Sequence, residues 1–143
     1  MLQRLRERAG SESGFTLVEL LVVMLILGLL AAIAIPSFFN QRDKAKDADA
    51  KASVRTAQTA AETFATDNNG EYTGMDAPAL KDIEQTLNNA DLSVEAVAAD
   101  SYTVRVTSTT DNTFDISRDG EGVTSLTCAT GGEAGCPTDE TWD

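Results

Sequence analysis

A run of apolar residues near the N-terminus, residues 15–35, constrains the fold more than any other part of the chain. Its sequence is FTLVELLVVMLILGLLAAIAI, in which Thr16 and Glu19 are the polar side chains. As a helix the run is about 31 Å long, close to the thickness of a membrane's hydrocarbon core. A backbone at that depth must satisfy its own hydrogen bonds, so the run predicts a helix. The carboxylate of Glu19 is costly in such a helix and indicates a function.

Composition excludes several classes of function. The chain has 143 residues, a formal net charge of −12 and no histidine. Without histidine, Ser-His-Asp and Cys-His nucleophile systems and the commonest metal ligand are absent. The acidic charge disfavours nonspecific contact with nucleic acid, so we expect no direct nucleic-acid binding. We therefore expect a protein that is not an enzyme and that holds no cofactor and no metal.

The first fourteen residues, MLQRLRERAGSESG, are polar and contain Arg4, Arg6 and Arg8. Such a segment is typical of a targeting leader, and its arginines would keep this end in the cytoplasm and place the residues after the run outside. On these features alone, two simpler interpretations remain open beside a more specialised signal. One is an ordinary signal peptide cut near residues 32–34, and the other is an uncleaved anchor.

A specific motif lies where the leader meets the apolar run. Residues 14–19, GFTLVE, followed by the long run, resemble the class III signal of type IV pilins and related pseudopilins. The resemblance implies that a prepilin peptidase cuts between Gly14 and Phe15 and that the new amino group of Phe15 is methylated. It also implies that Gly28 and Pro36 soften the helix, because the family often has helix-weakening residues there.

Glu19 and Phe15 are the residues that we expect to drive assembly. The helix would place the amino group created on Phe15 close to Glu19, and an axial shift between two helices would bring the amine of one to the carboxylate of the other. Leaving either charge unpaired in apolar surroundings is costly, so the pair would fix the register of subunits. This resembles the role proposed for the same glutamate in pilins. The alternative is a carboxylate that merely reaches the lipid headgroups.

The helical pattern resumes directly after Pro36, which predicts one helix from Phe15 to about Asp67, kinked at the proline. Asp47 and Lys51 have the spacing of an ion pair on such a helix. Residues 68–70, Asn-Asn-Gly, favour its end. The outer half would carry an apolar face that needs a cover. That face consists of Phe39, Ala50, Val54, Ala57, Ala61 and Phe64.

The rest of the chain predicts a small head. Pro78 suits the first turn of a short helix, which we expect to bury Leu80, Ile83 and Leu87. Alternating apolar residues then predict strands over 102–107, around 114–116 and over 123–128. These strands would form an antiparallel meander with one apolar face, covered by the outer half of the long helix. Trp142 is the lone large apolar residue of the tail.

Two cysteines, Cys128 and Cys136, lie close together near the C-terminus. In an exported head a disulfide between them is favoured, whereas a cytosolic protein would keep two free thiols. Closing so short a loop restricts the unfolded chain by about 2–3 kcal/mol.

The charged residues of the head allow several interpretations. The acidic groups Asp43, Asp47 and Asp49 and Asp139, Glu140 and Asp143 are interpreted as solvated surface rather than as calcium sites. The basic residues beyond the apolar run either pair with nearby aspartates or, as we favour, contact the acidic heads of neighbouring subunits. They are Arg42, Lys44, Lys46, Lys51 and Arg55.

The residues and the resemblance together predict an α+β chain with a pilin fold, in which a long N-terminal helix packs on a small antiparallel sheet. We expect a cleaved leader at 1–14, a transmembrane and filament-core half of the helix at 15–36, and a globular head at 37–143. The expected function is a structural subunit of a type IV pilus, for adhesion, motility or DNA uptake. A pseudopilin of type II secretion or competence and a membrane-anchored extracellular binding module remain alternatives.

The resemblance also implies partners and a location. The expected partners are further copies of the chain, the prepilin peptidase, the pilus assembly machinery and, before assembly, membrane lipid. The precursor would lie in the inner membrane with its head outside, and the mature subunit would lie in a filament on the cell surface.

Overall fold

The computed structural model describes residues 14–142, so the leader expected at 1–14 lies almost wholly outside the described residues. The chain divides into two compact units, one up to residue 38 and one from residue 39 onward. A single helix, α1 (Leu17–Asp67), contributes residues to both units. Pro36 lies inside α1 and does not end it, as expected. The softening of the helix at Gly28 and Pro36 stays a prediction.

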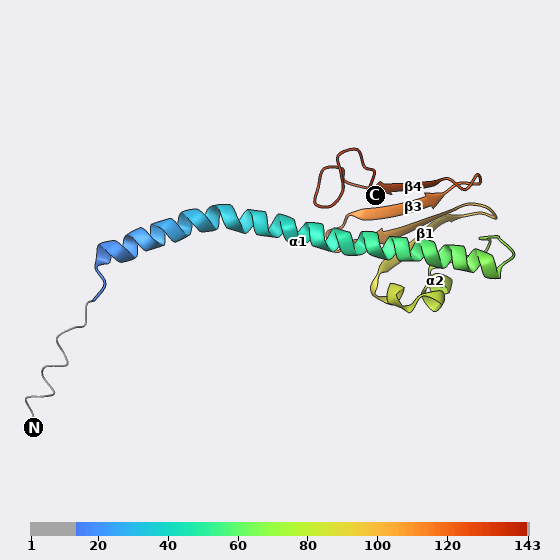
Figure 1. Cartoon of the computed structure of the whole chain (residues 1–143), viewed down its shortest axis with the longest axis horizontal. Coiled ribbons are helices and arrows are strands. Elements are labelled where there is room, and N and C mark those ends of the chain that lie inside the picture. Colours follow the sequence, from blue (N-terminus) through green and yellow to red (C-terminus); the bar gives the residue numbers. More distant parts are fainter. Residues whose placement is uncertain (1–13, 143) are drawn as a thin grey trace, which may run out of the picture. The chain divides into compact units, whose positions relative to one another are not determined.

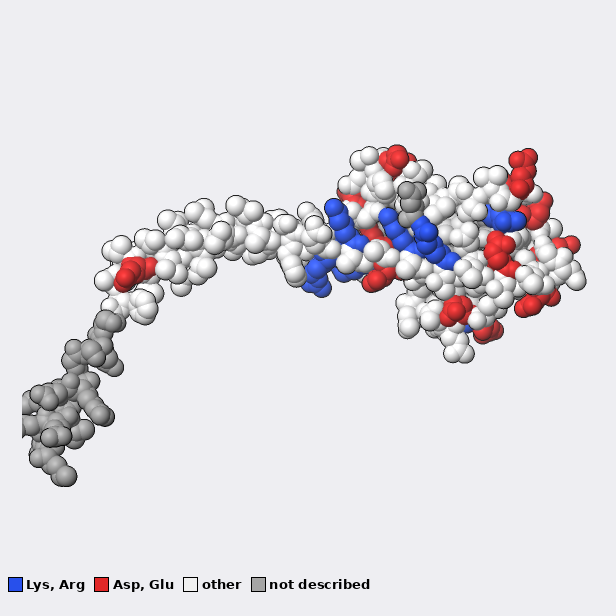
Figure 2. All heavy atoms as spheres, viewed as in Figure 1, with Lys and Arg blue, Asp and Glu red and all other residues white. Residues whose placement is uncertain are grey.

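In the first unit, α1 exposes its apolar side chains. The helix contains a segment long and apolar enough to cross a membrane, and none of that segment is buried. A signal sequence would meet the same criterion of length and composition. Figure 2 shows this part of the helix as a surface without Lys or Arg. So large an apolar surface needs lipid or protein around it.

In the second unit, the outer half of α1 packs on the sheet (Figure 1). Its buried apolar residues are Ala50, Val54, Ala57, Ala60, Ala61 and Ala65. Small side chains let a helix approach a sheet closely. The expectation that Phe39 belongs to this face is wrong, because its side chain is 54% exposed. The buried residues of α1 begin only at Asp47, eight positions later. Phe64 is half-buried against the core.

The end of α1 agrees with the expected cap. Asn69 and Gly70 have φ values of 60° and 87°, in the left-handed region. The backbone N–H of Gly70 donates to the carbonyl of Ala65 at 2.7 Å, which satisfies one of the last carbonyls of the helix. The Asn-Asn-Gly sequence therefore ends the helix by the mechanism its residues predict.

The short helix is divided in two. Asp76 caps α2 (Ala77–Ile83), accepting a hydrogen bond from the backbone of Ala79 at 2.9 Å. Glu84 is extended and opens a 3₁₀ helix, η2 (Gln85–Asn89). Leu80 and Leu87 are buried as expected, but Ile83 is 38% exposed. The prediction that one short helix buries all three residues was wrong at Ile83, because the chain changes direction at Glu84.

The sheet has four antiparallel strands in the order β1-β2-β3-β4. They are β1 (Asp91–Val97), β2 (Tyr102–Thr107), β3 (Thr113–Arg118) and β4 (Thr124–Cys128). The meander and its apolar face are confirmed, since Tyr102, Val104 and Val106 alternate into the core. Val123 lies outside β4 and is 61% exposed.

The sequence patterns missed the first strand, β1. In this strand Leu92 is the one buried residue. Its register with β2 shifts between Val94 and Ala96, where the strand has an irregularity. Residues 91–96 do alternate, with Leu92, Val94 and Ala96 apolar and the residues between them polar, so a strand signal was present in the sequence and was not used.

Candidate assembly site and the polar groups of the head

The start of α1 is held by a reciprocal cap between Thr16 and Glu19. The carboxylate oxygen Oε2 of Glu19 accepts hydrogen bonds from the backbone N–H and from the hydroxyl of Thr16, both at 2.9 Å. The backbone N–H of Glu19 in turn donates to Oγ1 of Thr16 at 3.2 Å. This is a capping box, and it satisfies donors that the first turn leaves free. The Thr-x-x-Glu spacing was the signal in the sequence, but it was not used to predict the cap.

Gly14 and Phe15 lie just before this cap. Residues 14–16 are not helical, and the side chain of Phe15 is 82% exposed. Phe15, Val18 and Glu19 help to line a shallow recess of about 500 Å³. All its lining residues except Glu19 are apolar. The structure therefore brings Phe15 and Glu19 to one place, with an apolar surface around a single carboxylate.

Gly28 has no neighbour that requires a glycine. A Cβ at this position would meet nothing within 4 Å. Gly28 therefore has no packing role in the isolated chain, and its softening of the helix stays a prediction.

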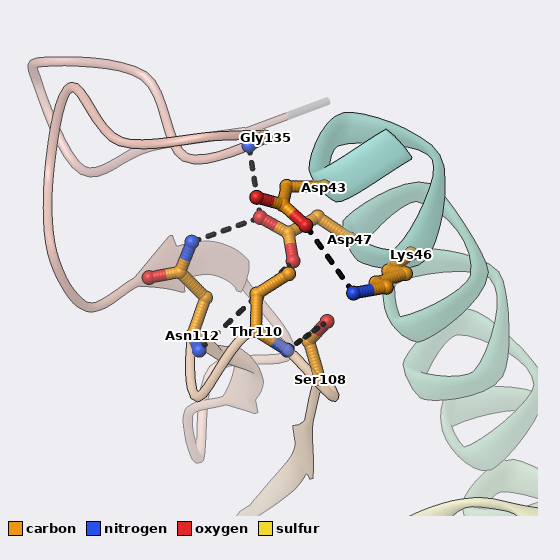
Figure 3. A network of polar contacts seen from close by, with 7 residues as sticks. All are labelled: Asp43, Lys46, Asp47, Ser108, Thr110, Asn112 and Gly135. Atoms are coloured by element: carbon orange, nitrogen blue, oxygen red, sulfur yellow. Dashed lines mark hydrogen bonds and ion pairs between the residues drawn. The ribbon is translucent and has the colours of Figure 1, made fainter. Parts of the chain in front are cut away.

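In the head, the carboxylate of Asp47 ties α1 to two loops (Figure 3). Its side chain is fully buried. Oδ1 accepts from the hydroxyl of Thr110, and Oδ2 accepts from Nδ2 of Asn112 at 2.8 Å and from the backbone N–H of Gly135 at 2.8 Å. Thr110 and Asn112 belong to the loop between β2 and β3, whereas Gly135 follows β4.

This carboxylate is ionised in its buried position. Burial opposes ionisation of Asp47, but the hydrogen bonds from Thr110, Asn112, Ser108 and Gly135 outweigh it and lower its pKa. The interpretation of Asp47 as solvated surface is therefore wrong. The position shares its helix face with Ala50 and Val54, three and seven residues later, and that spacing was the signal that could have found it.

The expected pair of Asp47 with Lys51 is also wrong. The ammonium of Lys51 lies 5.4 Å from the ring centre of Phe114 and 5.5 Å from that of Trp142. The guanidinium of Arg55 lies 5.2 Å from the ring of Trp142. Both cations therefore stack on aromatic faces.

The tail returns to the sheet and is fixed there. Cys128 and Cys136 form a disulfide, the predicted pairing, with their Cα atoms 5.9 Å apart. The indole N–H of Trp142 donates to the carbonyl of Thr127 at 2.8 Å, and its ring meets Phe114 edge-on at 5.9 Å between centres. Thr141 pairs with Thr127 in an isolated antiparallel bridge. Trp142 is therefore part of the core, a role that its place in the sequence did not indicate.

A second polar cluster surrounds Glu62 on α1. Its two oxygens accept hydrogen bonds from the hydroxyls of Tyr72 at 2.8 Å and Tyr102 at 3.0 Å. The guanidinium of Arg118 lies 3.7 Å from Oε1. Burial and the carboxylate of Glu62 raise the pKa of both tyrosines. Nothing in the sequence pattern pointed to this cluster, because its members lie on α1, β2, β3 and the loop that follows α1.

Comparison with known proteins places this sequence in a family. Residues 10–35 match the prokaryotic N-terminal methylation motif. The chain is 36% identical over 90 residues to the type IV wide pilus major component PilA4 of Thermus thermophilus, over 62% of this chain and 68% of that protein. The chain belongs to the type IV pilin and pseudopilin family.

Two other relatives of this pilin-family chain match over shorter segments. It is 45% identical over 51 residues to the type IV major pilin protein PilA of Myxococcus xanthus, over 36% of this chain and 23% of that protein. It is 40% identical over 57 residues to the type II secretion system core protein G of Pseudomonas aeruginosa, over 40% of each protein. The chain thus spans less than half the length of these two relatives. No solved structure matches it.

The methylation motif covers only residues 10–35 of this chain. It includes the capping box of Thr16 and Glu19, and it ends before Asp47. In residues 14–142, no group of three or more Cys, Asp or Glu side chains is placed to hold a metal ion. The carboxylates of Asp47 and Glu62 instead accept hydrogen bonds from other groups of the head.

Proposed function

We propose that this chain is the structural subunit of a type IV pilus and polymerises through the first half of α1. The observation that carries the proposal is a helix whose exposed apolar half continues into a folded head. Membrane lipid would surround the apolar half before assembly, and helices of other copies would surround it afterwards. Relatives in Myxococcus xanthus and Thermus thermophilus that are named as major pilus components support this function.

A second candidate function is that of a pseudopilin. The match to the core protein G of Pseudomonas aeruginosa and a further match to the competence protein ComGC of Halalkalibacterium halodurans favour it. Deleting the gene in the native cell separates the two. A pilus subunit is required for long surface filaments, and antibodies to the head would label those filaments in electron micrographs. A pseudopilin is required for secretion or DNA uptake without such filaments.

Processing is the first step of the proposed mechanism. A prepilin peptidase would cut between Gly14 and Phe15 and leave a methylated amine on Phe15. The match to the methylation motif supports this step, and so does the non-helical backbone of residues 14–16. The cap of Thr16 and Glu19 lies beyond the cut, so the mature helix would keep it.

N-terminal sequencing and mass spectrometry of the membrane-extracted protein test the cut. We expect the mature chain to begin at methylated Phe15, and we expect Gly14→Leu to leave an unprocessed and unassembled precursor. A chain that begins at Met1 or near residue 35 would contradict the cleavage.

Glu19 would then pair with the amine of Phe15 on a neighbouring copy. Both hydrogen bonds from Thr16 go to Oε2 of Glu19. Within residues 14–142, Oε1 of Glu19 accepts no hydrogen bond. Glu19 can therefore cap its own helix with one oxygen and accept the amine with the other. Such a pair would fix the axial register of the copies, since an unpaired charge among apolar helices is unfavourable.

Two substitutions separate the cap from the pair. Glu19→Gln keeps a side chain that can complete a capping box but removes the charge, whereas Glu19→Ala removes both. We expect both variants to be inserted and cut, and both to enter filaments poorly in the native cell. If Glu19→Gln forms filaments like the wild type, the carboxylate acts as a cap only and the proposed pairing is wrong.

A further inference from the structure

Charges of opposite sign gather on two separate surfaces of the head. Most lysines and arginines gather over α1 at the end where the second unit begins, with some carboxylates among them, and carboxylates predominate at the opposite end, where one basic group also lies (Figure 2). The basic group, here called the basic segment, lies on fourteen consecutive positions of the helix. It consists of Arg42, Lys44, Lys46, Lys51 and Arg55.

Most cations of the basic segment have no carboxylate partner among the described residues. Lys46 pairs with Asp43 at 3.2 Å. Arg42 and Lys44 are exposed and form no ion pair within residues 14–142. The remaining two lie on the aromatic rings described above, which holds their charge in place without neutralising it.

The opposite end, here called the acidic end, is built from the end of α1 and two hairpin turns. Its exposed carboxylates are Asp67, Glu71, Asp100, Asp119 and Glu121. The two turns are adjacent, because a Cβ on Gly120 would lie 2.8 Å from a carboxylate oxygen of Asp100. The turn residues 98–101 and 119–122 contain no Lys or Arg, and the one cation beside them is Arg118, whose guanidinium would lie 3.2 Å from a Cβ on Gly122 and faces Glu62.

The helix itself adds negative charge to the acidic end. The last turn of α1 has no basic residue, and it ends at Asp67. The C-terminus of a helix carries a partial negative charge, which a cation stabilises and a carboxylate does not. This end of the head is therefore unfavourable alone and would be stabilised by a cation from another molecule.

We propose that the basic segment of one copy of this chain docks on the acidic end of the next copy. The inference rests on the proposed function, because it describes how the heads of a filament meet. The two surfaces are different, so the contact is head-to-tail and repeats without closing. At the rise of an α-helix, Arg55 and Arg42 precede Asp67 by about 18 and 38 Å, so neighbouring copies would be shifted axially by about that range.

A second copy explains both ends of the head, whereas an anionic membrane surface explains only one. Lipid headgroups would bind the basic segment but would be repelled by the acidic end. Complementary charges also set the orientation of copies, since the like ends repel each other.

The test uses charge reversal in the full chain, expressed in the native cell. The first variant carries Arg42→Glu and Lys44→Glu, so that both ends become acidic. The second carries Glu71→Lys and Glu121→Lys, so that both ends become basic. These four side chains are exposed and form no hydrogen bond or ion pair within residues 14–142, so the head should still fold. Lys81→Glu and Asp82→Lys on α2 are the matched controls.

We expect each double variant alone to lower the yield of filaments at least about tenfold, and the controls to leave it unchanged. Expressed together, the two variants should form filaments that contain both chains in alternation, because the acidic ends of one match the basic ends of the other. Raising the salt concentration should weaken the contact, since exposed charges are screened.

Several results would overturn the inference. One is a normal yield from either double variant, and another is a failure of the mixed chains to assemble. A third result concerns the first variant alone. If it forms normal filaments, but its mature full chain no longer binds phosphatidylglycerol vesicles through the head, the basic segment binds lipid and not a second copy. If the wild-type chain forms no filament of any length, the proposed function itself fails, so the two failures are distinguishable.

Discussion

The carboxylate of Asp47 accepts a hydrogen bond of 2.8 Å from the backbone N–H of Gly135, 88 residues later in the chain. The contact is so close that a Cβ on Gly135 would lie 2.5 Å from the Cβ of Asp47. The loop closed by the disulfide can therefore reach the helix only with a glycine at this position. A charged group inside the head thus joins its first and last segments.

Asp47→Asn should destabilise the head by about 2–3 kcal/mol. The amide keeps the size of the side chain but loses the charge and one acceptor oxygen, so donors from Asn112 and Gly135 would compete for one oxygen. Urea unfolding of the full chain in detergent, followed by circular dichroism, measures the change. Asp49→Asn is the control, because Asp49 is exposed two positions away. Equal stability of the two variants would contradict the role of Asp47.

The contribution of Asp47 to stability should disappear in acid. Its pKa lies below the ordinary value of 3.8 in the folded head, so near this pH the unfolded chain binds more protons than the folded one. Stability from this group is then fully present above about pH 5 and is lost as the pH falls through the folded pKa. The difference in unfolding free energy between the wild type and Asp47→Asn should shrink below about pH 4. A difference that is constant with pH would show that the charge is not the cause.

Reduction of the disulfide should release the tail before the sheet unfolds. Trp142 is the only tryptophan, and its side chain is 4% exposed. Its fluorescence should therefore shift to longer wavelength when Cys128→Ser and Cys136→Ser are introduced together. The cost should be about 2–3 kcal/mol, while circular dichroism of the sheet remains. Buried Trp142 emission in the variant would mean that the hydrogen bond to Thr127 and the packing on Phe114 hold the tail without the disulfide.

The two tyrosines should resist ionisation in base. The chain has no tyrosine besides Tyr72 and Tyr102, and both have a raised pKa in the folded head. Tyrosinate absorbance should therefore stay low at about pH 10 in the folded chain and rise in urea. Because the folded pKa is raised, the stability from these groups is present below the unfolded pKa and is lost as the pH rises. Glu62→Gln should bring the titration curve of the folded chain closer to that of the chain in urea. An unchanged curve for the folded variant would exclude Glu62 as a cause of the raised tyrosine pKa.

Gly28→Ala tests the softening of α1. The added methyl meets nothing within 4 Å, and alanine favours the helix by about 1 kcal/mol. If a soft helix is needed for assembly, the variant should be processed normally and should enter filaments less well. The double variant Gly28→Ala with Ala32→Gly restores a glycine one turn later and should recover assembly. Normal filaments from Gly28→Ala would remove this role.

Sequence patterns predicted the elements that are determined by residues close together in the chain. The helix ends at Asp67 because Asn69 and Gly70 accept left-handed backbone, and Tyr102, Val104 and Val106 alternate because β2 has one buried face. The same alternation could have predicted β1, in which Leu92, Val94 and Ala96 are separated by polar residues, although Leu92 is the one residue of the strand that is buried.

The polar groups of the head were beyond local patterns. Asp47 lies in a run of charged residues, and its burial depends on loops that begin more than sixty residues later. Trp142 and Glu62 likewise take their roles from partners on other elements. At the start of α1, the importance of Glu19 was expected, but its capping bond was not.

Each strand pairs with the strand that precedes it in the sequence, so hairpins can form in the order in which the chain is synthesised. The carboxylate on α1 is different, because its last donor comes from Gly135. Until that residue has emerged, the growing chain carries an incompletely bonded helix face beside a nearly finished sheet. The loop that contains Gly135 is therefore the last part of the head to pack. A chain truncated before it would keep its strands but leave the face of α1 around Asp47 exposed to other proteins.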